Sequence, residues 1–577
     1  MKDPHGRLNI FNLLFQQAPN RVFLTIVLDA LSGIAYAMLI PLVLGSISTG
    51  DGALQIESEQ PQTFLGFEVL NHQYAALFVL AVFLILLTKG ISQFLMERVA
   101  VSVTADLRMS MYRRLLQAPV AEVERVGPSR FMAILTEDVP WIIAGGRLFP
   151  TMLSNLATLA GMLGYLAYLN AQAFWFVVQA LVVGSVTYQI PALIGLRFLR
   201  RKREFVDKLH HSVRALLDGF KELKLDRRKR ETFLTGELTV NELGVRDASR
   251  AGDTILMLAN IYGQLIHFFV IGIVAFVFVN YHAISNQELV AVIMTLLYIT
   301  APVAAVLQAI PGYMAAGVSL RNVNKLFFDI PVENAKPVFE AAAPWSTIRF
   351  ENVAYTHPET EAGKSGYRIG PVSFEISRGE CTFIIGGNGS GKSTLAKLIT
   401  LHYTPDQGKI YFGNERISDE TLNIYRQRIA FVYSDYYVFE KLLGVSDPEV
   451  KGEVDRYLCE LGLEHKIKFE NGQFSNLNLS DGQRRRLALL VAFIEDKDVY
   501  LFDEWAADQD PSFKDVFYYK ILSDLKRKGK AVVVISHDDR YFEVADRTLF
   551  MENGRLIRDQ DLEVIRRTRA ARQPTQA

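Results

Sequence analysis

Apolar residues gather into six long runs in the first 330 positions of the chain. The runs lie near residues 22–47, 74–96, 149–169, 173–196, 255–280 and 288–316. Each is close to the roughly 20 residues that a helix needs to cross the hydrocarbon core of a bilayer. Because that core offers no partner for free backbone groups, these runs predict six membrane-spanning helices.

Lys and Arg are distributed unevenly between the six runs. Residues 48–73, 170–172 and 281–287 contain neither, whereas residues 97–148 contain seven and residues 197–254 contain fifteen. Positive charge collects on the cytoplasmic side of a membrane, so we expect both termini and the two basic segments to be cytoplasmic. The acidic 48–73 segment is then on the opposite side, either as a small folded cap or as a disordered loop.

Both basic segments have helical spacing with few breakers, notably over residues 100–117 and 204–224. This pattern predicts that the membrane helices continue below the bilayer and turn round near Pro119–Val126 and near Leu217–Arg230. Turns of this kind are suited to dock onto a cytosolic domain.

A different pattern begins at residue 348, where short β-rich runs alternate with helical stretches. This alternation is typical of an α/β domain with a mostly parallel sheet. We therefore predict a membrane α-helical domain over residues 1–330 and a cytosolic α/β nucleotide-binding domain over residues 348–577. The intervening 331–347 is a linker rich in Pro and Ala.

Composition narrows the class of protein. Half of the residues are hydrophobic, 21% are charged and the mean hydropathy is +0.15, which excludes a mainly disordered chain. Two cysteines, Cys381 and Cys459, exclude a disulfide scaffold or a Cys-rich zinc site, and we expect both in the core of the α/β domain. Residues 1–330 carry 28 Lys and Arg against 24 Asp and Glu, a net charge of +4 that leaves −4 for the remainder. Neither half is basic enough for a nucleic-acid binder.

A glycine-rich segment, "GGNGSGKST", follows the apolar strand "CTFII". It fits the phosphate loop G-x-x-x-x-G-K-[ST], in which backbone N–H groups and a helix N-terminus cradle phosphates. We expect Lys392 to reach the β- and γ-phosphates of ATP, and Ser393 to ligate Mg²⁺. The other nucleotide-binding candidates in this segment are Gly386, Asn388, Gly389, Ser390, Gly391 and Thr394.

A second apolar strand, "DVYLFDE", ends in two carboxylates. In a parallel sheet its carboxyl end lies at the same edge as the phosphate loop. We expect Asp503 to face Mg²⁺, partly through water, and Glu504 to polarise the water that attacks ATP.

The segment "LSDGQ" resembles the signature of ATP-binding cassette proteins, with Asp481 in place of the first central Gly. The resemblance implies that Tyr355 stacks on adenine and that His537 contacts the γ-phosphate. It also implies that Ser480, Gly482 and Gln483 complete the ATP site of a partner subunit, and that Asp510 belongs to the loop that contacts the partner. Most cassettes have Gln where this chain has Ser434, a shorter side chain that puts coupling through this loop in doubt.

Six spans followed by one cassette resemble an ABC half-transporter of the exporter fold. The resemblance implies a homodimer with two composite ATP sites, ATP hydrolysis coupled to alternating access, and coupling helices near residues 119–126 and 217–230. The segment around Trp505, where "AADQD" replaces the usual run, is similar to the bacterial cyclic peptide exporter family.

The leading hypothesis is therefore ATP-driven export of a peptide-like cargo, a cyclic peptide or peptide siderophore, across the bacterial inner membrane. The alternatives are a lipid or multidrug flippase of the same fold, or a siderophore importer of that fold. Membrane lipids are expected neighbours, and any periplasmic or outer-membrane partner is undetermined.

Asp29, Lys89 and His267 lie well inside the predicted spans, where a charge costs about 2.5–3.5 kcal/mol at the centre. Asp29 and Lys89 lie at similar depth in the inner leaflet, so one hypothesis is an ion pair across two helices. The alternative is that Lys89 extends towards the interface while Asp29 faces a water-filled cavity. His267, near mid-span, is either a substrate contact or an interior hydrogen-bonded residue.

Overall fold

The computed structural model describes two compact parts of the chain. The first, here called the helical unit, comprises Met1–Tyr112 and Met132–Asp329, and the second, the α/β unit, comprises Arg113–Phe131 and Ile330–Ala577. Within them, the described residues are 10–47, 62–64, 67–69, 72–278, 280, 286–328, 330–333, 344–357, 366–444, 447–507 and 509–557.

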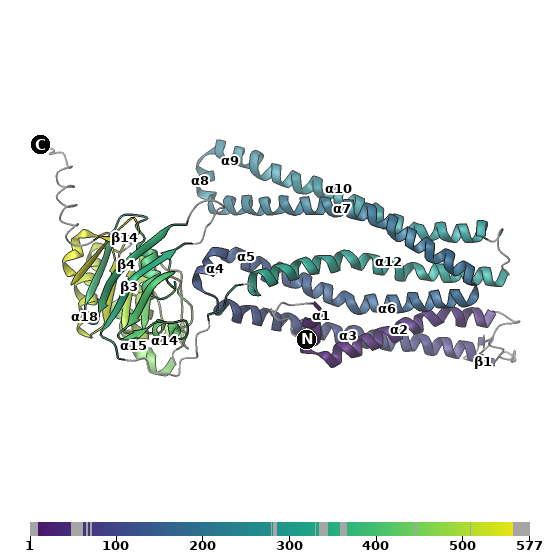
Figure 1. The fold of residues 1–577 in the computed structure, drawn as a ribbon, viewed down its shortest axis with the longest axis horizontal. Helices are drawn as coiled ribbons and strands as arrows, with labels where there is room; N and C mark the ends of the chain where they lie inside the picture. The colour runs from purple at the N-terminus through teal and green to yellow at the C-terminus, as the bar shows by residue number, and fades with distance from the viewer. Residues whose placement is uncertain are drawn as a thin grey trace. The chain divides into compact units, whose positions relative to one another are not determined.

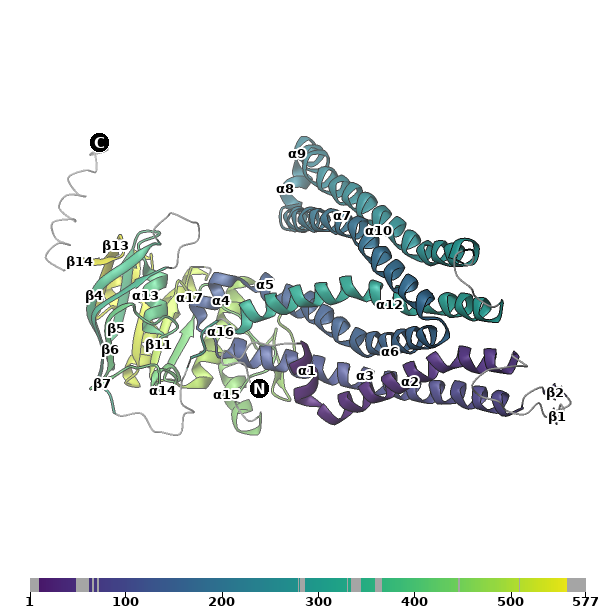
Figure 2. The same cartoon turned by 45° about the vertical axis from the view of Figure 1, so that its right-hand side comes forward.

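Long helices make up the helical unit. Their bounds are α1 Ile10–Gln17, α2 Pro19–Ile47, α3 His72–Leu116, α6 Val139–Leu169, α7 Ala171–Asp218, α8 Phe220–Leu225, α9 Arg227–Phe233, α10 Thr239–Ile273 and α12 Asn286–Val323. Single π-helical turns at Ile134–Asp138, Leu234–Leu238, Val274–Phe278 and Asn324–Phe328 extend several of them. In both views α2, α3, α6 and α12 run side by side, and α7 pairs with α10 (Figures 1 and 2).

Six helical segments among the described residues are long and apolar enough to cross a membrane. They are Pro19–Ser46, His72–Leu116, Arg130–Leu169, Ala171–Gly195, Arg227–Phe278 and Glu288–Phe327. Each contains most or all of one apolar run, so the prediction of six membrane-spanning helices is confirmed.

The two basic segments are helical, as predicted. Helix α3 continues to Leu116 and is followed by the short helices α4 (Val120–Val126) and α5 (Pro128–Ala133). Helix α7 continues to Asp218 before α8 and α9 reverse the chain. Only part of the acidic 48–73 segment is described, and there β1 (Gln62–Phe64) pairs antiparallel with β2 (Phe67–Val69).

Two larger sheets form the α/β unit. The first has the order β14-β13-β5-β12-β11-β8, in which only β14 is antiparallel to its neighbour. The second is antiparallel, with the order β4-β3-β6-β7. A hairpin of β9 (Phe469–Glu470) and β10 (Gln473–Phe474) stands apart from them.

The strands and helices of this unit have the following bounds. The strands are β3 Thr347–Thr356, β4 Arg368–Ser377, β5 Cys381–Gly386, β6 Gln407–Phe412, β7 Glu415–Arg416, β8 Ile429–Val432, β11 Val499–Asp503, β12 Ala531–Ile535, β13 Arg547–Glu552 and β14 Arg555–Ile557. The helices are α13 Lys392–Ile399, α14 Leu422–Arg426, α15 Asp447–Glu460, α16 Asp481–Glu495, α17 Pro511–Asp515 and α18 Leu522–Arg527, with a π-helical segment at Val516–Ile521 and a 3₁₀ turn at Asp539–Val544.

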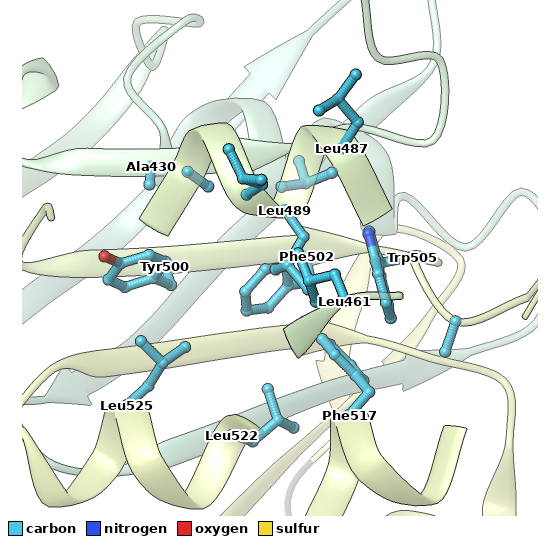
Figure 3. Close-up of a cluster of buried hydrophobic side chains, with 14 of the residues drawn as sticks. Ala430, Leu461, Leu487, Leu489, Tyr500, Phe502, Trp505, Phe517, Leu522 and Leu525 are labelled. Atoms are coloured by element: carbon cyan, nitrogen blue, oxygen red, sulfur yellow. The ribbon is translucent and has the colours of Figure 1, made fainter. Parts of the chain in front are cut away.

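The parallel strands are buried on both faces, which explains their continuous apolar runs. Successive side chains point to opposite faces, so Tyr500 and Phe502 pack in one core with α16 and α18, while Val499 and Leu501 pack in the other. Figure 3 shows the first core, where Trp505 lies beside Phe517. The two cores hold the sheet edge rigidly and so position the loops that leave it.

The cysteines and the linker do not fully match the expectations from the sequence. Cys381 is buried as expected, but Cys459 is exposed on α15, because its position falls on the outer face of that helix. The proposed linker lies mostly outside the described residues, since 334–343 are not described. Its role stays a prediction, as does the boundary at residue 348.

Candidate functional site

The glycine-rich segment joins the buried strand β5 to helix α13. Gly391 caps the helix with φ +102°, a left-handed conformation that favours glycine. A Cβ at Gly386 would lie 2.3 Å from the carbonyl oxygen of Met551, so only glycine fits that position without a shift. The backbone therefore closes tightly round the N-terminus of α13, where N–H groups and the helix dipole favour an anion.

Polar side chains complete this cradle. Lys392 is 6% exposed, and its ammonium donates to the carbonyls of Gly386 and Gly387 at 3.1 and 3.0 Å. Burial lowers the pKa of Lys392, opposed by the nearby carboxylates Glu504 and Asp503. The buried hydroxyl of Ser390 has no hydrogen-bond partner among the described residues, which fits a site that a phosphate would complete.

Two strand ends bring the acidic residues to the same edge. Strand β12 lies between β5 and β11, and Asp503 is in register with Ile535. Asp503 is 4% exposed, and burial followed by the charge of Glu504 raises its pKa to about 6. Glu504 has φ +51°, a strained conformation for a non-glycine residue, and its N–H donates to the carbonyl of Ile535 at 3.0 Å.

His537 follows β12 and meets Glu504 directly. Its Nε2 lies 3.0 Å from Oε1 of Glu504, and both side chains are partly exposed. A general base has to be within hydrogen-bond reach of the proton that it takes, and the role of Glu504 as that base stays a prediction.

The donor set at this edge suits Mg²⁺. Ser393 is exposed at the first turn of α13, and Asp503 offers a carboxylate, so both groups present oxygen. No cluster of three or more His, Cys, Asp or Glu that would hold a metal occurs among the described residues. An ion held by few protein ligands together with substrate phosphates is the usual arrangement for Mg²⁺.

Tyr355, the expected adenine-stacking residue, lies on β3 beside α13. It is 6% exposed and its ring stacks on Tyr403 with centroids 4.6 Å apart. His357 follows two residues later, and its Nε2 lies 3.0 Å from Oγ1 of Thr394 on α13. Tyr355 is thus tied to the phosphate helix, and stacking on adenine stays a prediction.

A carboxylate from the segment after α3 joins this aromatic group. Glu124 on α4 accepts from Lys397 Nζ at 2.8 and 2.9 Å and from the Tyr403 hydroxyl at 2.5 Å. Burial raises the pKa of Glu124, but these hydrogen bonds outweigh it and the pKa is lowered. Glu124, Tyr403 and Tyr355 therefore form one continuous contact from α4 to β3.

The signature residues form a separate hollow of about 420 Å³. Ser480 caps α16: its Oγ accepts from the backbone N–H of Gln483, and Oε1 of Gln483 accepts from the backbone N–H of Ser480. The hollow is lined by Ser480, Asp481, Gly482, Gln483, Arg486, Gln509 and Asp510. Among the described residues, none of the phosphate loop lines it, so the sequence-predicted residues fall into two groups.

Hydrogen bonds connect the signature helix to the segment after Glu504. Arg485 Nη1 donates to the carbonyl of Glu504 at 2.5 Å and to that of Trp505 at 3.1 Å. Trp505 Nε1 donates back to the carbonyl of Arg485 at 2.9 Å. Gln509 adds a second connection, donating to the carbonyl of Gly482 and accepting from Arg486.

Ser434 lies exposed on the loop after β8. The next residue, Asp435, is close enough for its charge to contribute to the raised pKa of Asp503. A carboxylate is therefore available near the position where most cassettes have Gln.

Several residues of this site escaped the sequence reasoning. They are Glu124, His357, Lys397, Tyr403, Asp435, Arg485 and Gln509. Arg485 lies two residues after the signature "LSDGQ" and Gln509 lies inside "AADQD", so the recognised motifs offered a signal for both. Glu124 had none, because its partners are 273 and 279 residues away in the chain.

Comparisons with known proteins cover most of the chain. Residues 22–303 match the family described as "ABC transporter transmembrane region", and residues 369–507 match "ABC transporter". The chain is 30% identical over 563 residues to "ATP-binding protein SyrD" of Pseudomonas syringae pv. syringae, covering 96% of each protein. It is 24% identical over 482 residues to an "ATP-dependent lipid A-core flippase" of Shewanella oneidensis, covering 78% of this chain and 76% of that protein.

One solved structure gives the same fold over nearly the whole chain. A bacterial Atm1-family ABC exporter with ATP bound superimposes with a TM-score of 0.71 at 19% identity, covering 97% of this chain and all of that one. At this identity the likeness supports the fold alone.

Proposed function

This chain belongs to the ABC transporters, as a half-transporter of the exporter fold, and on that premise we propose that it exports a peptide-like cargo across the bacterial inner membrane. Membership of this family means that the chain is a multi-pass membrane protein that binds and hydrolyses ATP to drive transport. The cargo, a cyclic peptide or peptide siderophore, and the direction are the proposed part.

The observation that carries the cargo class is the segment after Glu504. Its resemblance to the cyclic peptide exporters rests on Trp505 and the residues up to Asp510. In the structure Trp505 is 1% exposed, and its ring stacks on that of Phe517 with centroids 4.3 Å apart. Its indole N–H donates a hydrogen bond to the signature helix. This variation is therefore built into the core rather than placed on the surface.

A lipid flippase is the second candidate function. It is favoured by the similarity to the lipid A-core flippase, which extends over most of both chains. The identity to that protein is lower and its coverage shorter than for the Pseudomonas relative, so we place peptide export first.

We assign the ATP site to the edge at β5, β11 and β12. Lys392 and the phosphate-loop backbone would bind the phosphates, while Ser393 and Asp503 would hold Mg²⁺, which neutralises phosphate charge when bound. Glu504, oriented by His537, would accept the proton of the attacking water.

A homodimer would complete this site. The signature hollow presents Ser480 and Gly482 without a phosphate loop of the same chain, which supports a second copy that supplies one. Apolar side chains also stand exposed at Leu225 (90%) and at Tyr437 (79%), as expected of surfaces that an assembly covers.

Transport into inside-out membrane vesicles tests the proposal. We expect ATP-dependent accumulation of a labelled cyclic lipopeptide or peptide siderophore by the wild-type protein and none by Glu504→Gln. Glu464→Gln, which changes a surface carboxylate paired with His465, is the matched control and should transport normally.

Vesicles that hydrolyse ATP but accumulate neither cargo would contradict peptide export. Movement of a fluorescent lipid between leaflets in the same vesicles would then identify the flippase instead.

A further inference from the structure

A polar crevice opens between three helices of the helical unit. It has a volume of about 340 Å³ and lies between α2, α3 and α6. Its lining residues are Asp29, Lys89, Ser92, Gln93, Met96, Glu97, Arg147, Pro150, Thr151, Ser154 and Asn155. Four ionisable groups in one crevice within apolar helices require a physical reason, because charge is disfavoured there.

Asp29 is the buried acid of the crevice lining. It is 3% exposed, and one of its oxygens accepts a hydrogen bond from Ser92 Oγ at 2.6 Å. A carboxylate has about four acceptor positions, so this single bond leaves most of its hydrogen-bonding capacity unused.

Lys89 lies on the wall, one turn of α3 from Ser92. Its ammonium lies over the ring of Tyr36, 5.3 Å from the centroid. One hypothesis from the sequence is an Asp29–Lys89 ion pair, but no N–O contact within 4.0 Å joins these two residues in the described part of the chain. Both residues line the crevice.

The other two charges neutralise each other. Arg147 Nη2 bonds to Glu97 Oε1 at 2.7 Å, and both side chains are about half exposed. This pair leaves one anionic and one cationic group, Asp29 and Lys89, available in the crevice, together with the amides of Gln93 and Asn155.

We propose that the crevice binds a zwitterionic group, with its ammonium against Asp29 and its carboxylate or phosphate against Lys89. The inference rests on the proposed transport function, because the crevice would hold the charged end of the transported molecule. Charge-assisted hydrogen bonds of both signs would select a zwitterion over a singly charged molecule of equal size. Amide groups would hydrogen-bond the atoms between the two charges.

Three dansyl probes with matched fluorophores test the selectivity. Nα-dansyl-lysine carries a carboxylate and an ammonium, dansyl-norleucine only the carboxylate, and dansylcadaverine only the ammonium. Binding is measured by fluorescence with the full-length protein, free of nucleotide, in phosphatidylglycerol nanodiscs. We expect the Kd of dansyl-lysine to be about tenfold or more below those of the other two.

Single substitutions assign each charge. Lys89→Met should raise the Kd of dansyl-lysine and dansyl-norleucine about tenfold and leave that of dansylcadaverine unchanged. Asp29→Asn should raise the Kd of dansyl-lysine and dansylcadaverine about tenfold and leave that of dansyl-norleucine unchanged. The unaffected probe in each variant reports that the helices remain folded. Lys202→Met and Asp253→Asn, a Lys–Asp pair of 4.0 Å outside the crevice, are the matched controls.

Competition identifies the source of the group. Displacement of dansyl-lysine by the unlabelled dipeptide glycyl-lysine would support a peptide ligand, and displacement on adding phosphatidylethanolamine would support a lipid headgroup. Equal binding of all three probes, equal effects of both variants on every probe, or displacement by neither competitor would overturn the proposal.

This experiment is separate from vesicle transport. Intact probe selectivity without peptide transport would refute the proposed cargo and leave the crevice standing. Transport without probe selectivity would refute the crevice alone.

Discussion

The backbone around Glu504 is held by hydrogen bonds from residues outside strand β11. Its positive φ is unfavourable for a residue with a Cβ, so the surrounding bonds have to maintain it. Arg485 supplies two of them from the signature helix, and Trp505 returns one. Since α16 begins with the residues proposed to contact a partner's ATP, this connection links the two sites at the level of single side chains.

Trp505→Phe tests that connection. The substitution retains an aromatic ring against Phe517 but removes the indole N–H bonded to Arg485. One lost hydrogen bond of about 1 kcal/mol predicts a roughly fivefold fall in the kcat of ATP hydrolysis. The KM for ATP should change little, because the phosphate loop is untouched.

Tyr500→Phe is the control, a buried aromatic on β11, the strand that precedes Trp505, and it also loses one polar group. A fall in kcat of equal size in both variants, or a change in KM alone in Trp505→Phe, would indicate general loosening of the core rather than displacement of Glu504.

Helix α4 illustrates how one short element gains a role from its contacts. It has seven residues, none of them buried, and belongs to the α/β unit although it follows the membrane-spanning helix α3 in the chain. Glu124 attaches it to Lys397 of the phosphate helix and to Tyr403, which stacks on Tyr355. A movement of α4 would therefore displace residues that contact the proposed adenine and phosphate sites.

Glu124→Gln weakens this attachment without changing the size of the side chain. Loss of charge-assisted bonds worth about 1.5–3 kcal/mol predicts that cargo moved per ATP hydrolysed falls roughly tenfold. The measurement is the ratio of vesicle uptake to phosphate release.

The neighbouring Glu122→Gln is the control, because Glu122 bonds to Arg125 within the same helix. Equal uptake per ATP in Glu124→Gln and wild type would remove α4 from the coupling path.

At the scale of the whole molecule, the question is whether ATP sites are shared between two chains. The signature hollow and the phosphate loop are separate groups within one chain. If the sites are shared, two inactivating mutations leave one intact ATP site when they lie on different chains and none when they lie on the same chain.

Mixed dimers in a Glu504→Gln background test this prediction. A Lys392→Ala chain paired with a Ser480→Arg chain should retain one intact site and bind about one ATP tightly per dimer. The Lys392→Ala/Ser480→Arg double variant paired with an otherwise unaltered chain should bind none, because each site then contains one lesion. The opposite result would mean that each chain completes its own site.

Local patterns in the sequence determined much of this protein. The six apolar runs are long enough to identify membrane helices without knowledge of their neighbours, and the solvent for those helices is the bilayer itself. Strand β5 with its glycine-rich turn, and strand β11 with its two terminal carboxylates, are likewise local, since a phosphate loop needs particular residues at consecutive positions.

Contacts between distant segments were decided only by the tertiary structure. Asp29 and Lys89 lie at similar depth, as an ion pair would require. In the packing of α3 against α2, however, Asp29 accepts a hydrogen bond from Ser92, and the Lys89 ammonium lies over the ring of Tyr36. Glu124 meets Tyr403 across 279 residues, and Arg485 reaches Glu504 because α16 packs on β11. Side-chain partners depend on helix rotation and register, which the periodicity of a sequence leaves open, whereas helix length and the phosphate loop depend on neighbouring residues alone.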